Sequence, residues 1–320
     1  MRLVHSRTEN LTVAVLMGGQ SAEADVSVNS AIQIEAALRE VGFKVKLLEL
    51  NGDCARKLQE MKPDVVFPAL HGPPGEDGTV QGMLEMLGLP YVGSDVRGSA
   101  MAMDKGVAKL LFRRHSLPVS DEVVIHPDDN LAAALSKVLK GTGDRVAIKP
   151  MNQGSAIGVQ LYPNGGDIEA GILATSVYGA CMVEPFIAGR EMTVGVLHLE
   201  EDIIAHPVIE IRTPDDEWYD YKNRYTKGKS EHIVPAPISA ELTKQLQDIA
   251  VKAHQALGLR DFSRADFIVN DDDEVFLLEV NTLPGMTPLS LYPEGAQNIG
   301  YTFSQLVETL VNIAYQRGQL

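Results

Sequence analysis

The sequence predicts an α/β protein of several domains, beginning with a parallel sheet covered by helices. The first third of the chain alternates strand-like and helix-like patterns, and this order is typical of parallel sheets. Beyond it, the alternation gives way to separate helices, short strands and a long hairpin. With 320 residues, 45% of them hydrophobic and 22% charged, the chain is long enough for two or three globular domains.

Buried strands and amphipathic helices alternate in this first third, which we expect to form one domain, residues 1–96. A helix is predicted from about Ser21 to Val41, where Gly42 would terminate it, and another over 79–88. The predicted strands are LTVAVLMGG at 11–19, FKVKLLEL at 43–50, DVVFPAL at 64–70 and LPYVG at 89–93. The start of the chain is therefore Rossmann-like.

The pattern changes near Val96, where a helix rich in Met, Lys and Arg begins. A strand at 119–125, a helix at 131–139, the strand VAIKP at 146–150 and a Gly-containing loop indicate a small domain, residues 97–187. The third domain is predicted to span residues 188–320. Its expected elements are strands at 191–197 and 203–211, a polar tract at 212–230, a helix at 240–257, a hairpin formed by RADFIVN and EVFLLEVN, and a helix at 302–316.

Charge and cysteine content exclude several classes of protein. Lys and Arg total 28 against 43 for Asp and Glu, giving a net charge of −15, so a general nucleic-acid binder is not expected. Cys54 and Cys181 lie far apart and form no CxxC, which predicts neither a disulfide framework nor a cysteine zinc site. The early apolar stretch at 11–17 is short and ends at Gly18, so we expect a cytoplasmic protein without export signal, membrane span or membrane partner.

The predicted hairpin carries the clearest sign of chemistry. If the chain reverses near Asp272, then Asp266 falls opposite Glu279, with Asn281 two positions further along the strand. Two carboxylates and an amide suit Mg²⁺, although a solvent face that merely carries charges is the alternative. The surrounding apolar run weakens that alternative, because unpaired buried carboxylates are costly. Strict alternation places Phe276, Leu278 and Val280 on one face, and Glu279 and Asn281 on the other.

Phosphate-loop motifs give a weaker signal. The string KGKS at 227–230 is not the end of a Walker A loop, because Asn223 stands where its first Gly is required. No GxGxxG fingerprint follows the first strand. The string KPMNQGSAIGV is a better candidate, since Lys149 ends a strand and Gly154, Ser155 and Gly158 follow in a flexible loop that could also be an ordinary turn.

Taken in order, eight strings resemble the D-alanine–D-alanine ligases of the ATP-grasp superfamily. They are GGQSAEADVSVNSA, ALHGPPGEDGTVQGMLEMLGLPYVGS, MDK, IKPMNQGSAIGV, VEPFIAGREMTV, YDYKNRYT, RADF and LLEVNTLPGMTPLSL. The resemblance implies a three-domain ATP-grasp fold and a homodimer. It also implies an enzyme of peptidoglycan precursor synthesis that uses ATP and two Mg²⁺ ions, with Mn²⁺ possible. The ATP γ-phosphoryl group would go to the carboxylate of one D-alanine, and the amine of a second would attack the D-alanyl phosphate.

The resemblance also assigns site residues. On the amino-acid side, Glu23 holds the ammonium of the first D-alanine, with His71 beside it. The hydroxyls of Ser155 and Tyr225 link to Glu23 and shut the site. Ser290 and Leu291 recognise the carboxylate of the second D-alanine. By local sequence alone, Glu23 could equally cap a helix.

On the nucleotide side, the resemblance places Lys105, Lys149 and Arg224 at the ATP phosphates, together with the loop that contains Ser155. It places Glu184 beside the adenine and Glu191 at the ribose. Asp266, Glu279 and Asn281 match the metal ligands, and Arg264 with the Gly285 N–H matches the donors that stabilise the oxyanion.

Two departures and two alternatives remain. Ala156 stands where many members carry a second Ser, and Arg224 where many carry a Lys, which keeps the charge but not the geometry. The chain could be a ligase of other amino acids, or a silent module that only senses ATP. A sensor has no use for the retained Glu23 and Arg264.

Because an acyl phosphate must be shielded from water, the polar tract at 212–230 is expected to act as a lid.

Overall fold

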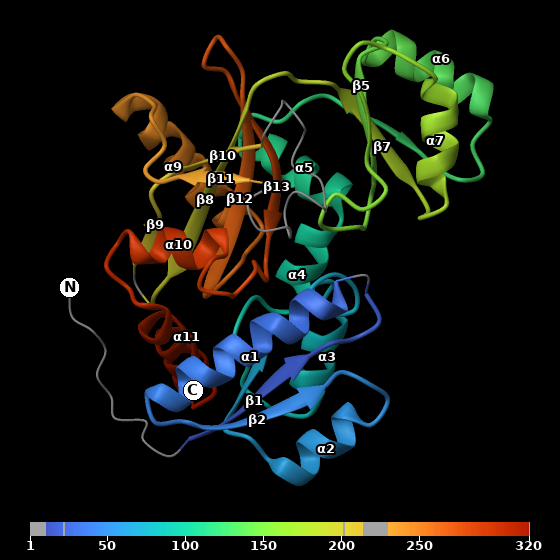
Figure 1. Cartoon of the computed structure of the whole chain (residues 1–320). Helices are drawn as coiled ribbons and strands as arrows, with labels where there is room; N and C mark the ends of the chain where they lie inside the picture. The colour runs from blue at the N-terminus through green and yellow to red at the C-terminus, as the bar shows by residue number, and fades with distance from the viewer. Residues whose placement is uncertain (1–10, 22, 201, 214–229, 320) are drawn as a thin grey trace.

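The computed structural model describes residues 11–21, 23–200, 202–213 and 230–319. The described residues form three β-sheets with helices packed on them (Figure 1). The N-terminal sheet is parallel and the other two are antiparallel. This arrangement confirms the predicted α/β class, including the parallel sheet at the start of the chain. No helix among the described residues has the length and apolarity needed to cross a bilayer.

The N-terminal sheet has the strand order β2-β1-β3. Strands β1 and β3 are apolar runs buried on both faces, as expected of a parallel sheet covered by helices, whereas the edge strand β2 alternates between exposed and buried residues. The strands are β1 (Thr12–Met17), β2 (Lys44–Glu49) and β3 (Val65–Pro68), and the helices are α1 (Ala24–Glu40), α2 (Cys54–Met61) and α3 (Thr79–Met86). Helix α2 was not predicted, and it buries only Cys54 and Leu58. The expected strand at 89–93 is reduced to one bridge between Tyr91 and Val66.

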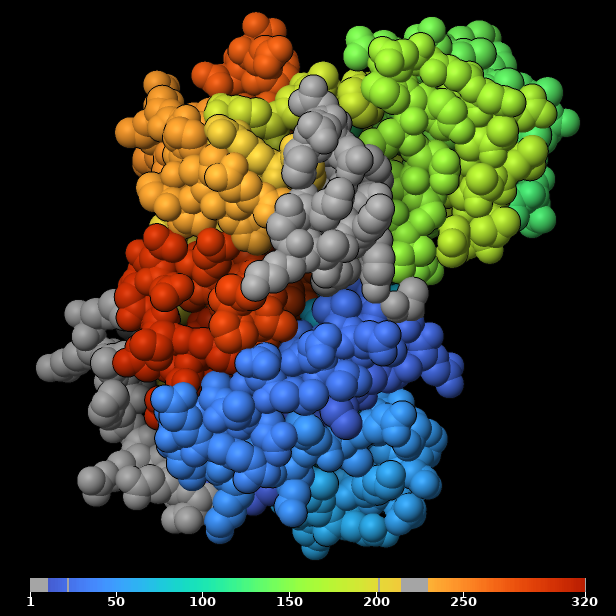
Figure 2. Space-filling model, in the orientation of Figure 1, coloured from blue at the N-terminus to red at the C-terminus, as the bar shows by residue number. Residues whose placement is uncertain are grey.

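The last helix packs against the first sheet. Helix α11 (Phe303–Arg317) begins with a capping box, in which Thr302 and Gln305 each accept a hydrogen bond from the other's backbone N–H. Its apolar face, including Leu306 and Leu310, belongs to the same buried cluster as β1. Figure 2 shows these red C-terminal residues lying directly on the blue N-terminal ones. Strand β1 and helix α11 therefore share one core.

The predicted Met-, Lys- and Arg-rich helix is two helices, α4 (Val96–Met103) and α5 (Lys105–Arg114). The break is at Asp104, whose backbone is extended at φ −80° and ψ 101°. Its carboxylate accepts hydrogen bonds from the N–H groups of Gly106 and Val107, both at 3.0 Å, and so caps α5. This cap fixes the direction in which α5 presents Lys105.

The second sheet lies in the green lobe at the upper right of Figure 1 and has the order β4-β7-β5-β6. Its elements are β4 (Val123–Ile125), α6 (Leu131–Gly141), β5 (Val146–Pro150), β6 (Gln160–Tyr162), α7 (Ile168–Ser176) and β7 (Cys181–Pro185). The predicted strand VAIKP and the helix at 131–139 are confirmed. Three elements after the Gly-containing loop, β6, α7 and β7, were not predicted.

The third sheet has the order β11-β10-β8-β12-β13, with β9 paired to β8. Its strands are β8 (Arg190–His198), β9 (Ile203–Ala205), β10 (Ile209–Arg212), β11 (Glu231–Ile233), β12 (Phe262–Val269) and β13 (Val275–Asn281). Helix α9 (Ala240–Ala256) packs on this sheet, and the short α10 (Leu291–Gln297) lies beside β8. The single strand predicted at 203–211 is divided into β9 and β10 by His206 and Pro207.

Candidate active site

The hairpin of β12 and β13 has the predicted register. Asp266 lies opposite Glu279, Arg264 lies opposite Asn281, and the chain reverses between Asn270 and Glu274. The two carboxylates therefore come from paired strands at the centre of the molecule.

The predicted division of β13 into two faces is wrong. A β-bulge opposite the Asp266–Phe267 step makes Leu278 an extra residue, so the alternation shifts by one position. The side chains of Val275, Leu277 and Val280 enter the core, whereas Leu278 and Glu279 line a cavity together. The bulge turns Glu279 toward that cavity and leaves its pairing with Asp266 intact.

Arg264 and Asp266 form a buried bidentate ion pair. The Nε of Arg264 donates to Oδ1 of Asp266 at 2.9 Å, and Nη2 donates to Oδ2 at 2.7 Å. Thr193 on β8 donates a further hydrogen bond to Oδ1 at 2.6 Å. A planar guanidinium held in two places cannot rotate, so its remaining N–H groups keep a fixed direction toward the cavity that Arg264 lines.

Two cavities meet beside this hairpin. The first has a volume of about 780 Å³ and the second about 580 Å³. Lys105, Gln153 and Glu279 line both cavities, so the two adjoin at these three residues. Lys105 bridges the junction, because its Nζ lies 3.3 Å from Oε2 of Glu279 and donates to the Gln153 carbonyl at 2.6 Å.

The first cavity brings together most of the predicted amino-acid site. The residues of that predicted site that line it are Glu23, His71, Ser155, Ser290 and Leu291. Five residues predicted for the phosphates, the metal and the oxyanion also line it: Lys105, Arg264, Glu279, Asn281 and Gly285. The Ser155 hydroxyl donates a hydrogen bond to Glu23 across a sequence separation of 132 residues. Two glycines pack closely against the same carboxylate. A Cβ at Gly72 would lie 3.2 Å from Oε2 of Glu23, and a Cβ at Gly154 would lie 3.4 Å from it. These close approaches hold Glu23 against the loop that carries Ser155.

Glu23 stands at the N-cap position of α1 but makes no side-chain capping bond. Its carboxylate is nearly fully buried and turns toward the cavity. The capping alternative is therefore not what the structure shows. A buried carboxylate in a cavity is suited to holding an ammonium group.

At the far wall of this cavity, Ser290 precedes α10. Its Oγ accepts from the Thr287 N–H at 3.1 Å and lies 2.8 Å from the Thr287 hydroxyl. A Cβ on Gly285 would lie 3.1 Å from the same Oγ, so glycine lets the 284–290 loop close on itself. Gly285, Ser290 and Leu291 all line the cavity.

Glu76, which was not predicted from the sequence, also lines this cavity and is buried. Its Oε2 accepts a hydrogen bond from the Gly72 N–H at 2.7 Å. Burial, together with the nearby charge of Glu23, raises the pKa of Glu76 to about 8. Burial also lowers the pKa of the neighbouring His71, so the imidazole is neutral. The string HGPPGEDG contains the signal, an acid five residues after His71, among residues that are typical of turns.

The raised pKa of Glu76 predicts a change in the pH dependence of stability. Between the ordinary value of 4.5 and about 8, the folded protein keeps a proton that the unfolded chain has lost, so stability falls as pH rises through this window. Glu76→Gln should remove that contribution, at most a few kcal/mol, and flatten the melting temperature between about pH 5 and pH 8. Exposed Glu60→Gln is the matched control. Equal pH profiles for wild type and Glu76→Gln would contradict the assignment.

The sequence analysis also missed a His–carboxylate pair in the first cavity. The Nδ1 of His232 on β11 lies 2.7 Å from Oε2 of Glu294 on α10. No motif distinguished either residue, because they are 62 positions apart in the chain. The pair ties β11 to the helix that follows Ser290.

The second cavity contains the predicted nucleotide residues Lys105, Lys149, Glu184 and Glu191. Lys149 Nζ lies 2.6 Å from Oε2 of Glu184. Burial alone would raise the pKa of Glu184, but the ammonium groups of Lys149 and Lys109 outweigh it and lower the pKa to about 2. Burial acts in the opposite direction on Lys149, and Glu184 outweighs it to raise the pKa of the amine. Both groups therefore stay ionised near neutral pH, and they form an ion pair on the wall of this cavity.

The oxygen donors at the hairpin are of the kind that a hard divalent cation takes, but Asp266 lines neither cavity, and both of its oxygens accept hydrogen bonds from Arg264. The described ranges hold no cluster of three or more His, Cys, Asp and Glu placed to bind a metal by themselves. Asp266, Glu279 and Asn281 supply two carboxylates and an amide, and Mg²⁺ commonly takes its other ligands from water and substrate phosphates. Arg224 and Tyr225 of the expected lid fall within 214–229, outside the described residues.

Comparisons with known proteins identify a single family. The family model described as "D-ala D-ala ligase C-terminus" matches residues 111–312, and the one described as "D-ala D-ala ligase N-terminus" matches residues 49–94. A D-alanine–D-alanine ligase from Halalkalibacterium halodurans is 43% identical over 96% of this chain and all of its own length. One from Rhodospirillum rubrum is 45% identical over 94% of this chain and 97% of its own.

Solved structures agree with these sequence matches. The D-Ala:D-Ser ligase VanG from Enterococcus faecalis superposes with a TM-score of 0.83 at 30% identity, covering 96% of this chain and 100% of that one. A D-alanine–D-alanine ligase from Bacillus anthracis, complexed with ATP, superposes with a TM-score of 0.80 at 27% identity, covering 97% and 99%. These matches confirm the ATP-grasp fold expected from the sequence.

Proposed function

The chain belongs to the D-alanine–D-alanine ligase family, and on that premise we propose that it joins two D-alanine molecules with the use of ATP. The reaction has two steps. A carboxylate oxygen of the first D-alanine attacks the γ-phosphorus, giving ADP and D-alanyl phosphate. The amine of the second D-alanine then attacks the acyl carbon, and phosphate leaves with that carboxylate oxygen. The product is a precursor of peptidoglycan.

The meeting of the two cavities is the observation that carries this proposal. A ligase of this kind must bring a phosphate donor and a carboxylate together while keeping the rest of each molecule in separate sites. The cavity lined by Lys149, Glu184 and Glu191 takes ATP, and the cavity lined by Glu23 takes the amino acids. Their junction at Lys105 and Glu279 is where the phosphoryl group changes partners.

Glu23 holds the ammonium of the first D-alanine, and Ser155 fixes the carboxylate of Glu23 in position. The neutral imidazole of His71 and the protonated Glu76 lie beside it and add no charge that would repel the zwitterion. The buried cavity also strengthens the ion pair between Glu23 and the substrate, because solvent screening is weak there. The first substrate is thereby oriented by charge.

Lys105 and Lys149 neutralise the phosphates, Glu191 binds the ribose and Glu184 borders the base. Asp266, Glu279 and Asn281 are the residues that would hold two Mg²⁺ ions, or Mn²⁺, whose charge offsets the phosphate charge during transfer. The expected role of the tract at 212–230 as a lid, with Arg224 at the phosphates and Tyr225 at Ser155, stays a prediction, because both residues lie outside the described residues.

Arg264 and the Gly285 N–H stabilise the oxyanion formed when the second amine attacks. The bidentate ion pair with Asp266 holds Arg264 in place before the charge develops, which is how preorganised donors lower a barrier. Ser290 and Leu291 receive the carboxylate of the second D-alanine. We further propose that the enzyme is a homodimer and that it acts in the cytoplasm, where ATP is available.

A panel of amino acids tests the proposed function. Phosphate release from ATP is measured with D- and L-alanine, D-serine, other D-amino acids and the hydroxy acid D-lactate, and the product mass is determined. We expect D-alanine to support the fastest release, with one D-alanyl-D-alanine formed per phosphate. A clear preference for another amino acid, or ATP hydrolysis without dipeptide, would reject the assignment.

Removing the charge of Glu23 should affect the first amino acid and spare the nucleotide. Glu23→Gln keeps the size of the side chain, so ATP binding should stay within about twofold, whereas D-alanine affinity at the first site and phosphoryl transfer should fall at least about tenfold. Initial rates at varied D-alanine and isothermal titration with a non-hydrolysable ATP analogue measure the two effects. Asp25→Asn, on the same cavity wall, is the control. Weakened nucleotide binding with unchanged D-alanine binding would reverse the roles of the two cavities.

A further inference from the structure

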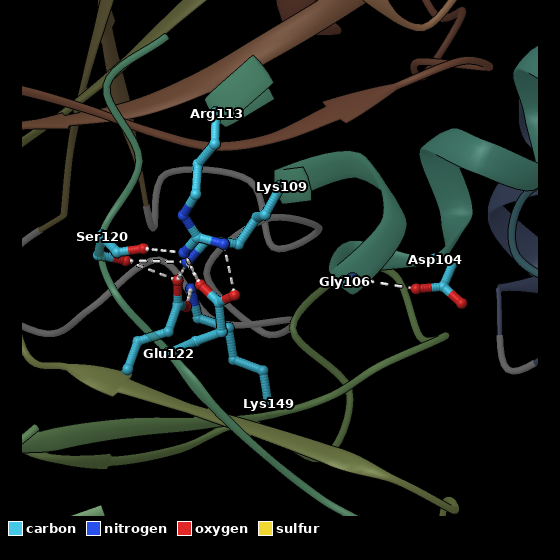
Figure 3. Close-up of polar contacts among 8 residues, drawn as sticks. Asp104, Gly106, Lys109, Arg113, Ser120, Glu122 and Lys149 are labelled. Atoms are coloured by element: carbon cyan, nitrogen blue, oxygen red, sulfur yellow. Dashed lines mark hydrogen bonds and ion pairs between the residues drawn. The ribbon is translucent and has the colours of Figure 1, made fainter. Parts of the chain in front are cut away.

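Helix α5 presents a stripe of three cations along one face. Lys105, Lys109 and Arg113 recur every four residues, so their side chains lie above one another. Each forms an ion pair with a carboxylate from a different part of the chain: Lys105 with Glu279, Lys109 with Glu184 and Glu122, and Arg113 with Glu122. Figure 3 shows the inner part of this network, with Lys109 between Arg113 and Lys149.

Lys109 is a fully buried cation that the proposed reaction does not use. Its side chain is 2% exposed, and it lines neither of the two cavities, so it cannot touch a ligand there. Its Nζ contacts Oε1 of Glu184, lies 3.0 Å from Oε2 of Glu122, and lies 3.1 Å from the Ser120 hydroxyl. Such desolvation is costly for an ammonium group, and partners on several sides are needed to offset it.

Glu184 lies between two ammonium groups. Lys109, which lines neither cavity, contacts Oε1 of Glu184. The Nζ of Lys149, which lines the second cavity, lies 2.6 Å from Oε2. Ser120 also donates to Oε1 at 2.7 Å. The order from the surface to the cavity is Arg113, Glu122, Lys109, Glu184 and Lys149, so charges alternate and cations exceed carboxylates by one. The cation at the cavity end is Lys149.

We propose that Lys109 is a positioning residue for nucleotide binding. It neutralises the carboxylate of Glu184 on the side away from the second cavity, so that the charge of Lys149 stays available to the ATP phosphates. Without Lys109, Glu184 would have only Lys149 as a cationic partner. Lys149 would then be drawn to Glu184, and its field at the cavity would be largely cancelled. On the side away from Glu184, Glu122 pairs with Lys109 and also with Arg113. The inference rests on the proposed site for ATP in the second cavity.

The test measures the affinity of purified full-length variants for the non-hydrolysable analogue AMPPNP with Mg²⁺, and the KM values for ATP and D-alanine. Lys109→Met should raise the AMPPNP Kd and the ATP KM about 10- to 100-fold, the range typical of outer-shell partners, and leave the D-alanine KM within about twofold. Arg113→Met is the matched control on the same helix face, with an expected change below about twofold, because Glu122 keeps Lys109 as its partner.

A double-mutant cycle separates positioning from general destabilisation. In a Glu184→Gln background, adding Lys109→Met should change the AMPPNP Kd by less than about threefold, because the carboxylate through which Lys109 acts is gone. The same loss in both backgrounds, equal losses for both substrates, or wild-type affinity in Lys109→Met would each overturn the inference.

A second variant covers the case in which Lys109→Met does not fold. Glu122→Gln is nearly isosteric and leaves Glu184 as the anionic partner of Lys109. Glu184 should then be neutralised at least as well as in wild type, so the AMPPNP Kd should be equal to or lower than that of wild type. A higher Kd would overturn the inference. Failure of the wild-type protein to bind AMPPNP with Mg²⁺ is a different result, because it rejects the proposed ATP site itself.

Discussion

Replacing Glu279 by glutamine is expected to lower the rate of ligation about 100-fold or more, while leaving the fold intact. Glu279 stands at the junction of the two cavities, opposite Asp266 and 3.3 Å from Lys105. The amide keeps the shape but removes the charge that a divalent cation and Lys105 both require. The rate is measured as D-alanyl-D-alanine formed at saturating ATP, D-alanine and Mg²⁺, and thermal melting checks the fold.

A control on the same hairpin makes this result specific. Glu274 lies at the exposed turn, where its carboxylate accepts a hydrogen bond from the Asn270 side chain at 2.7 Å. Glu274→Gln should therefore retain ligation within about twofold, as expected of a surface substitution. Asp266→Asn should resemble Glu279→Gln. Near-normal turnover in a folded Glu279→Gln or Asp266→Asn protein would remove the proposed metal site.

Arg317→Ala is expected to lower the free energy of unfolding by about 3–5 kcal/mol, the usual effect of leaving one partner of a buried ion pair alone. The side chain of Asp261 is 1% exposed and lies between Arg317 on α11 and the Gly93 N–H. Arg317 Nη1 lies 2.5 Å from Oδ1 of Asp261, and Nη2 donates at 2.8 Å to the Tyr91 carbonyl. These contacts join the end of the N-terminal sheet to the start of β12.

Urea denaturation followed by circular dichroism measures this change. Arg56 pairs with Glu60 at 2.8 Å on an exposed helix face, so Arg56→Ala is the matched control and should change stability by less than about 1 kcal/mol. A change for Arg317→Ala no larger than that of the control would show that this contact does not hold the N-terminal sheet to the third sheet.

The part of the site that depends on local pattern could be predicted from the sequence. Alternation and a single reversal placed Asp266 opposite Glu279, and the structure has that pairing. Long periodic elements such as α1, α9 and β12 also lie where the pattern predicts them. In these segments one face is buried along the whole length, so burial and period agree.

The features that local pattern missed depend on contacts between distant segments. The bulge at Leu278 has no sequence signal, and it overturned the predicted faces of β13. Helix α2 is short and mostly polar, and it buries only Cys54 and Leu58. Glu76 lies within a string of turn residues, and its pKa depends on burial beneath Gly72 and on the charge of Glu23. Only the folded chain brings those groups together.

The family resemblance carried the assignments that single residues could not. Glu23 and Ser155 are 132 positions apart, yet the structure joins them by a hydrogen bond. The cation stripe on α5 was visible in the sequence as residues four apart, but its meaning required knowing that Glu122 and Glu184 face it. The sequence spacing therefore predicts where the cations of α5 lie, but only the packing of the folded chain shows which carboxylates they contact.

The central claim is that a D-alanine carboxylate is phosphorylated where the two cavities meet. Its most direct test uses D-alanine labelled with ¹⁸O in both carboxylate oxygens, together with ATP and Mg²⁺, followed by mass spectrometry of the inorganic phosphate. One ¹⁸O atom should appear in each phosphate released during dipeptide formation, because that oxygen forms the bond to phosphorus and leaves with it. Unlabelled phosphate accompanying D-alanyl-D-alanine would contradict the account.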